Sequence, residues 1–191
     1  MELLNELHIE VLRGKASKDD MRAERFRRIF LHYGEQVSPA IIQEAVMRYR
    51  QAYKNARRAI FGVVPLLQAL HSRVHIAVVT NNALIEQQEK LQVCGLTSLV
   101  DTLVASGEVG SIKPEAAIFE ITLQRIGCCA HEAIMIGDSW KADVMGAQGA
   151  GIEAIWFNRG RLPYPEPMKV RELRSFEPLE AVLEILFAPL L

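Results

Sequence analysis

The first sixty residues place apolar side chains at helical spacing. Two such runs end at glycines, the first at Gly14 and the second, which begins at Ser17, at Gly34. A third begins at Ser38-Pro39, which joins a residue type that caps helices to a proline suited to the first helical position. The pattern therefore predicts three consecutive helices.

The third of these helices carries aromatic side chains on its apolar face. Tyr49 and Tyr53 continue the spacing of Ile42 and Val46. Because the four positions fall on one side of a helix with 3.6 residues per turn, we expect the two tyrosines to lie in a core rather than to form a stacking surface.

The hydrophobic period changes near Phe61. Short apolar runs rich in β-branched residues predict strands over residues 74–80, 101–105, 133–138 and 152–157. Helical patterns accompany them over residues 65–70, 84–93, 114–127, 141–148 and 179–187. This alternation predicts an α/β fold built on a doubly wound, parallel, Rossmann-like sheet with helices on both faces.

Composition narrows the class of protein. The chain has 191 residues, half of them apolar, and a net charge of −1, which gives no reason to expect a nucleic-acid or membrane partner. The three cysteines have the spacing of neither a zinc site nor a disulfide framework, and no signal-peptide pattern is present, so a cytoplasmic protein is expected. Residues 1–60 are net basic and the remainder net acidic, which suits a phosphate-handling site with a metal but equally suits solvated helix faces.

Polar side chains follow three of the predicted strands. Thr80 and Asn81 follow the first, Lys113 precedes a proline at a helix start after the second, and Asp138 ends the third, with Asp143 one turn into the next helix. Ligands of open parallel sheets bind outside the carboxyl ends of the strands, so we expect these residues to converge. Two neighbouring carboxylates repel unless a cation or proton separates them, and Mg²⁺ fits their hard oxygen atoms. Singly, these residues also fit structural roles: a turn, a helix start and an N-cap.

The order of these motifs resembles that of the haloacid dehalogenase-like (HAD) hydrolase superfamily. VVTNN resembles its second motif, SIKP its third, and GDSWKADVMGAQGAG its fourth. The resemblance implies a helical cap over residues 1–60 and a HAD-like core over residues 61–191. It further implies a Mg²⁺-dependent phosphatase that acts on a small phosphorylated metabolite such as a sugar phosphate or a nucleotide.

The resemblance also implies a role for each residue of the motifs. Thr80 would hydrogen-bond the oxygens of the transferring phosphoryl group, and Asn81 would help to shape the site. Lys113 would neutralise charge on the nucleophile and the phosphate. Asp138 would hold Mg²⁺, and Asp143 would support the ion directly or through water. These roles suit phosphoryl transfer, which depends on positioning and charge neutralisation.

The family's first motif, Asp-x-Asp-x-Thr at the end of an apolar strand, does not occur in this sequence. Its first aspartate is the nucleophile, so the resemblance predicts no turnover by the chain as it stands. In the family, the strand of this motif lies between the strands that here end at Thr80 and Asp138. Three explanations remain open: a coding start upstream of Met1, a remnant that does not cleave, or a strand supplied by another chain. The unpaired strand edges would also favour self-association through the gap in the sheet.

Other functions remain possible. The chief alternative is a non-catalytic binding or regulatory protein that keeps the fold and a ligand site. A phospho-receiver domain fits poorly, because there the acidic pair comes first along the chain and the lysine last. Substrate choice would rest with the cap, where four arginines are candidate ligands of a phosphate or sugar: Arg22, Arg25, Arg48 and Arg50.

Overall fold

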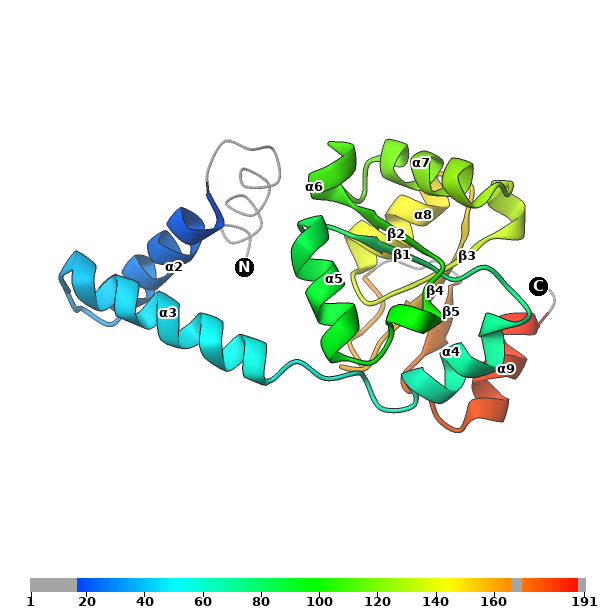
Figure 1. Ribbon diagram of the computed structural model, residues 1–191, viewed down its shortest axis with the longest axis horizontal. Helices are drawn as coiled ribbons and strands as arrows, with labels where there is room; N and C mark the ends of the chain where they lie inside the picture. Colours follow the sequence, from blue (N-terminus) through cyan, green and yellow to red (C-terminus); the bar gives the residue numbers. More distant parts are fainter. Residues whose placement is uncertain (1–16, 166–169, 189–191) are drawn as a thin grey trace. The chain divides into compact units, whose positions relative to one another are not determined.

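The computed structural model describes residues 17–165 and 170–188 (Figure 1). The helix expected before Gly14 lies outside these residues. Internal contacts divide the chain into two compact units, Met1–Arg58 and Ala59–Leu191, and each is described by itself. That the first unit acts as a cap stays a prediction.

The described part of the first unit is a pair of helices, α2 (Lys18–His32) and α3 (Pro39–Asn55). The predicted N-cap at Ser17 is confirmed, because its hydroxyl oxygen accepts a hydrogen bond of 3.0 Å from the backbone N–H of Asp20. The two helices meet through an edge-to-face contact between Phe26 and Tyr49, whose ring centroids lie 5.8 Å apart.

The expectation that the tyrosines of α3 lie in a core is wrong. Ile42 and Val46 are buried, but Tyr49 and Tyr53 are 36% and 48% exposed. Their rings stack on each other, and the guanidinium group of Arg25 lies 4.6 Å from the centre of the Tyr49 ring. A helix packed on one described neighbour buries only the side chains at the contact, so its apolar spacing extends beyond the buried face.

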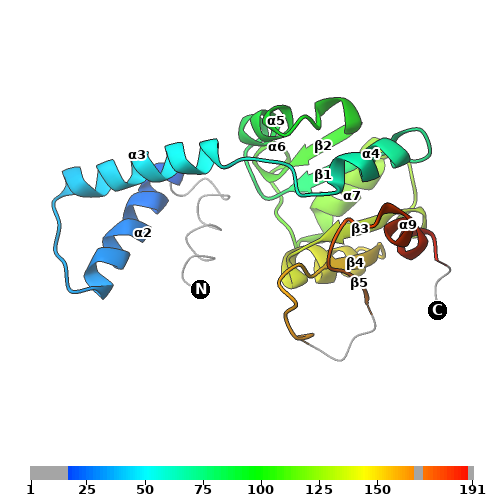
Figure 2. The same ribbon diagram turned by 90° about the horizontal axis from the view of Figure 1, so that it is seen from below.

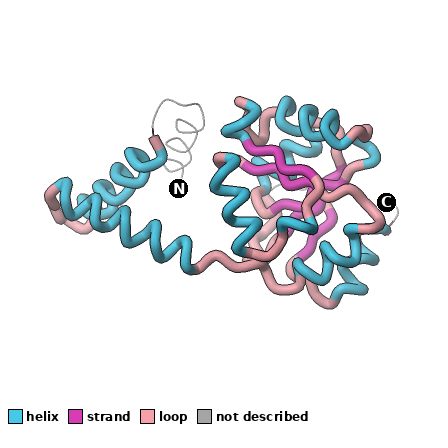
Figure 3. The backbone as a smooth tube through the Cα atoms, in the orientation of Figure 1, coloured by secondary structure: helices cyan, strands magenta, loops and turns pink. Residues whose placement is uncertain are grey.

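Within residues 59–165 and 170–188, the second unit contains five strands (Figure 3). They are β1 (Ala77–Thr80), β2 (Thr102–Ala105), β3 (Ile134–Gly137), β4 (Glu153–Phe157) and β5 (Arg171–Leu173). Every pairing between them is parallel, as the alternation of strands and helices predicted. Strand β5 was not expected, because its short sequence, Arg-Glu-Leu, lacks an apolar run.

The described helices of this unit lie before, between and after the strands. They are α4 (Val63–His71), α5 (Leu84–Val93), α6 (Ser106–Val109), α7 (Ala116–Ile126), α8 (Gly146–Gly149) and α9 (Leu179–Phe187). Short 3₁₀ turns cover Thr97–Leu99 and Ala130–Glu132. The helix expected over residues 141–148 divides into a π-helical segment, Trp140–Met145, followed by α8. No helix within residues 17–165 and 170–188 has the length and apolar character that crossing a membrane requires.

Two apolar clusters hold the strands and helices together. One gathers side chains of α4, α9 and the strand β4, including Leu66, Ile155 and Val182. The other gathers side chains of α7 and the π-helical segment, including Phe119 and Val144, around Trp156. Figure 2 shows helices on both faces of the strands, as expected for this class of fold.

The strands do not form one continuous sheet. β1 pairs with β2, and β3 pairs with β4, which in turn pairs with β5. β1 and β3 face each other without a ladder between them, across a cavity of about 550 Å³. The expected parallel α/β fold is therefore present, and its sheet is interrupted between β1 and β3, where the strand of the family's first motif was expected to be missing.

Candidate active site

Lys113 connects the two sheets at the carboxyl ends of their strands. Its ammonium group donates a 2.7 Å hydrogen bond to the carbonyl oxygen of Val79 in β1. The same nitrogen lies 2.7 Å from Oδ1 of Asp143, which belongs to the segment after β3. The side chains of Lys113 and Asp143 are only 10% and 6% exposed, so this ion pair is shielded from solvent.

Asn81 fixes the backbone of Lys113. Its side-chain oxygen accepts a 2.8 Å hydrogen bond from the N–H of Lys113, and its side-chain nitrogen donates a 2.9 Å bond to the carbonyl oxygen of the same residue. An amide side chain carries both a donor and an acceptor, which is why asparagine can make this reciprocal contact and an aspartate cannot. Asn81 therefore positions Lys113 from the end of β1.

Asp143 is held by the turn that follows β3. Its Oδ2 accepts a 2.9 Å hydrogen bond from the N–H of Ser139. Its Oδ1, although at ion-pair distance from Lys113, has no partner with hydrogen-bond geometry. Gly137 makes this approach possible, because a Cβ atom there would lie 2.3 Å from the Cβ of Asp143.

Thr80 and Asp138 occupy the ends of β1 and β3 beside these residues. Thr80 is half-buried, and its hydroxyl group makes only a long contact, 3.5 Å, with Oε1 of Gln87. Asp138 is exposed, and its carbonyl oxygen accepts a 3.1 Å hydrogen bond from the indole N–H of Trp156. The structure thus joins Asn81, Lys113 and Asp143 by direct contacts and leaves the other two beside them.

A cleft of about 630 Å³ adjoins Asp138 at the ends of β3 and β4. Its wall includes the cationic residues Lys90 and Arg159 together with Asn158. A cleft that combines one carboxylate with two cationic side chains can accept an anionic ligand and a metal ion together.

Asn158, which the sequence did not single out, organises this cleft. Its side chain donates to the carbonyl oxygen of Leu162 and to the carboxylate of Glu172, and it accepts from the N–H of Leu162. The hydrogen bond from Arg174, together with a smaller contribution from Asn158, lowers the pKa of Glu172. The sequence offered one indication of this role, which is that Asn158 directly follows a predicted strand.

The carboxylates meet the needs of a magnesium ion only in part. Among the described residues no group of three His, Cys, Asp or Glu side chains could hold a metal. Mg²⁺ often binds through one or two carboxylates and keeps several water molecules, so Asp138 and Asp143 remain compatible with it. One oxygen of Asp143 is already ion-paired with Lys113, which leaves Asp138 as the more accessible ligand.

Comparisons with known proteins concern the family of the chain. The model of the family described as haloacid dehalogenase-like hydrolase matches residues 3–157. The HAD-hydrolase YfnB of Bacillus subtilis is 29% identical over 174 residues, which cover 90% of this chain and 73% of that protein. Its crystal structure, bound to magnesium, superposes with a TM-score of 0.75 at 25% identity, covering 96% of this chain and 79% of that one.

Two further relatives are named as enzymes that remove phosphate. The pyrimidine 5'-nucleotidase PynA of Streptococcus pneumoniae is 29% identical over 86% of this chain and 70% of its own length. The phosphoserine phosphatase of Thermus thermophilus is 36% identical over 61% of this chain, and the match spans 49% of that enzyme.

Proposed function

Because the chain belongs to the haloacid dehalogenase-like hydrolase family, we propose that it supplies the phosphate-binding and Mg²⁺-binding side of a phosphatase site. The observation that carries the proposal is the buried ammonium group of Lys113, held between β1 and Asp143 at the carboxyl ends of two parallel sheets. Relatives named as a nucleotidase and a phosphoserine phosphatase support a small phosphorylated metabolite as the substrate.

The exposure and charge of each residue suggest its role in the proposed site. Asp138, exposed at the end of β3, would hold Mg²⁺, and Asp143 would support the ion directly or through water. The metal would neutralise charge on the phosphate oxygens. Thr80 would donate a hydrogen bond to one of those oxygens, since its contact with Gln87 is long, 3.5 Å, and leaves the hydroxyl group available. Lys113 would add positive charge to the same region.

Turnover needs a nucleophile that this sequence does not show in the family's motif. No Asp-x-Asp-x-Thr is present, and none of the aspartates near the site follows an apolar strand in the place of that motif. We therefore expect the 191-residue chain to bind Mg²⁺ and phosphate without rapid hydrolysis. A non-catalytic binding or regulatory protein is the second candidate, and the Lys113–Asp143 ion pair favours it, because it satisfies the lysine without any further carboxylate.

Calorimetric titration of Mg²⁺ in the presence of inorganic phosphate tests the proposed binding. We expect saturable binding to the unaltered chain and a loss of roughly tenfold or more in affinity, about 1.4 kcal/mol, for Asp138→Asn. Glu120→Gln is the matched control, because it also removes one exposed carboxylate but lies on the helix α7. Equal affinities for Asp138→Asn and Glu120→Gln would remove Asp138 from the proposed site.

A further inference from the structure

A glutamine occupies a buried position of the helix α5. Gln87 is only 8% exposed, and the other buried residue of this helix is Leu91. Burying a side-chain amide costs free energy unless hydrogen bonds replace those that it made to water. Thr122 and Ser111, which are similarly buried, meet this cost with side-chain hydrogen bonds of 2.7 and 2.9 Å. The amide of Gln87 therefore calls for a partner as well.

The partner that the structure gives Gln87 is Thr80. Oγ1 of Thr80 lies 3.5 Å from Oε1 of Gln87, and this is the one side-chain hydrogen bond of Gln87 within residues 17–165 and 170–188. Side chains of a helix lean toward its amino terminus, so Gln87, the fourth residue of α5, reaches back to the end of β1. A glutamine amide carries two donor hydrogens in addition to its acceptor oxygen, and this contact uses neither hydrogen.

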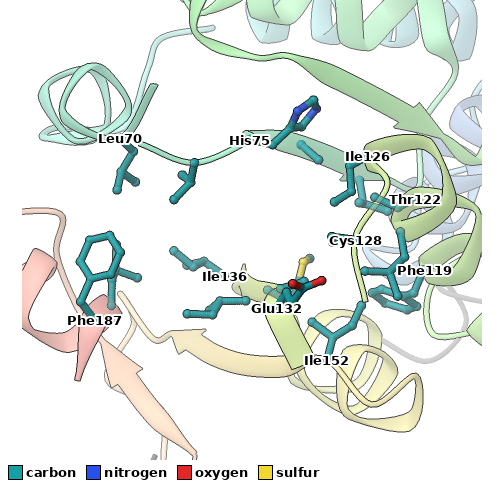
Figure 4. A pocket seen from close by; sticks show the side chains of 18 residues that line it. Leu70, His75, Phe119, Thr122, Ile126, Cys128, Glu132, Ile136, Ile152 and Phe187 are labelled. Atoms are coloured by element: carbon teal, nitrogen blue, oxygen red, sulfur yellow. The ribbon is translucent and has the colours of Figure 1, made fainter. Parts of the chain in front are cut away.

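The contact lies away from the interruption of the sheet. Figure 4 shows the side chains that line the cavity between β1 and β3, and neither Thr80 nor Gln87 is among them. Thr80 pairs instead with Ala105 of β2, the strand on which α5 also packs. The pair formed by Thr80 and Gln87 therefore belongs to the continuous part of the structure.

The hydroxyl group of Thr80 has a single proton, and the direction of that proton decides what the group can bind. While the proton is donated to Oε1 of Gln87, none remains for an oxygen of an anion. A half-turn of the amide about its last side-chain bond exchanges Oε1 for Nε2, which can then donate to Oγ1 of Thr80. The threonine proton is thereby released for a ligand at the end of β1. A hydroxyl group that accepts a hydrogen bond also becomes a stronger donor.

We infer that Gln87 is a positioning residue, whose amide donates to Thr80 when an anion binds and so directs the threonine proton to an oxygen of that anion. The inference rests on the proposed phosphate site and adds to it a residue that does not touch the phosphate. The length of the contact suits this role, because a weak hydrogen bond is readily exchanged for another. A purely structural glutamine would instead affect stability and leave anion binding unchanged.

Calorimetric titration of inorganic phosphate at saturating Mg²⁺ tests the inference through a double-variant cycle. Gln87→Met keeps the length of the side chain but has no hydrogen to donate. We expect it to weaken phosphate binding about three- to tenfold, the effect of losing one neutral hydrogen bond. In a Thr80→Val background the same change should have no effect, because no hydroxyl proton is left to direct. Gln88→Met is the matched control, since Gln88 is an exposed residue of the same helix, and it should leave the affinity unchanged.

A second measurement needs no change at Gln87. NMR follows the exchange of its side-chain NH₂ protons with water in the unaltered chain and in Thr80→Val. Phosphate with Mg²⁺ should slow the exchange of one of these protons in the unaltered chain, because that proton gains an acceptor, and should not do so in Thr80→Val. The side-chain protons of Gln88 should exchange at the same rate throughout.

The outcomes separate this inference from the proposed function. Normal phosphate affinity of Gln87→Met, or equal weakening by Gln87→Met in both backgrounds, would overturn the inference alone. Exchange of the Gln87 amide protons that does not respond to phosphate would overturn it too. Failure of the unaltered chain to bind phosphate would refute the proposed function and the inference together.

Discussion

Removing one partner of the Lys113–Asp143 ion pair should destabilise the second unit strongly. The two side chains are 10% and 6% exposed, and their charged atoms lie 2.7 Å apart. Breaking a pair this deeply buried costs about 3–5 kcal/mol, because the remaining charge stays in a poorly solvated place. We expect a loss of that size for Lys113→Met and for Asp143→Leu when each is made alone.

The double variant separates this explanation from simple loss of contacts. Lys113→Met with Asp143→Leu removes both charges together, and the remaining penalties are the lost acceptor of the Ser139 N–H and the lost donor to the Val79 carbonyl oxygen, each about 1 kcal/mol. We therefore expect the double variant to be more stable than either single variant.

Urea unfolding followed by tryptophan fluorescence measures these changes. Both tryptophans, Trp140 and Trp156, lie in the second unit, and their rings meet edge to face at 5.0 Å. A loss of 3–5 kcal/mol lowers the midpoint by roughly 1.5–2.5 M urea for a domain of this size. The control is Glu108→Gln, which breaks the more exposed pair with Arg125 and should cost no more than about 1 kcal/mol. Single variants that cost as little as the control, or losses that simply add in the double variant, would refute the reasoning.

Two further predictions concern packing and protonation. Gly137→Ala should lower stability by about 1–3 kcal/mol in the same urea assay, because the new Cβ would lie 2.3 Å from that of Asp143, whereas Gly149→Ala, with no atom within 4 Å, should be neutral or stabilising by up to ~1 kcal/mol. Equal effects of the two alanines would contradict the packing argument. Hydrogen bonds from Arg27 and then from Arg28 lower the pKa of Glu24 to about 2. The contribution of the Glu24 carboxylate to stability should therefore be complete above pH 4.5 and decline as the pH falls toward 2. Carboxyl-carbon NMR should give a Glu24 midpoint well below 4.5, and an ordinary midpoint would show that the ion pairs do not persist in solution.

The class of fold could be predicted because the spacing at which apolar residues repeat along the chain distinguishes helices from strands. Strands at Ala77–Thr80 and Glu153–Phe157 were expected from apolar β-branched runs, and their parallel pairing followed from the helices between them. β5 could not be predicted in this way, because its three residues pair through backbone hydrogen bonds that sequence period does not report. The prediction that Tyr49 and Tyr53 are buried was wrong, because the spacing of apolar residues identifies the face of a helix but not how much of that face a neighbouring helix covers.

The candidate site could be predicted as a set of residues but not as a network. Topology places the carboxyl ends of parallel strands together, which brought Thr80, Lys113 and Asp138 into one region. The reciprocal hydrogen bonds between Asn81 and Lys113 join residues 32 positions apart, and no spacing rule reports such a contact. The pairing of Lys113 with Asp143 likewise depends on how closely two separate sheets approach each other.

Hydrolysis of p-nitrophenyl phosphate in the presence of Mg²⁺ tests the central claim most directly. The comparison is between this 191-residue chain and the same chain preceded by an apolar strand that ends in Asp-x-Asp-x-Thr. We predict Mg²⁺-dependent hydrolysis by the longer chain and none above background by the shorter one. Comparable rates for the two chains would contradict the account, because the nucleophile would then lie among the present residues, and inactivity of a folded longer chain would contradict the assignment of the site to phosphate hydrolysis.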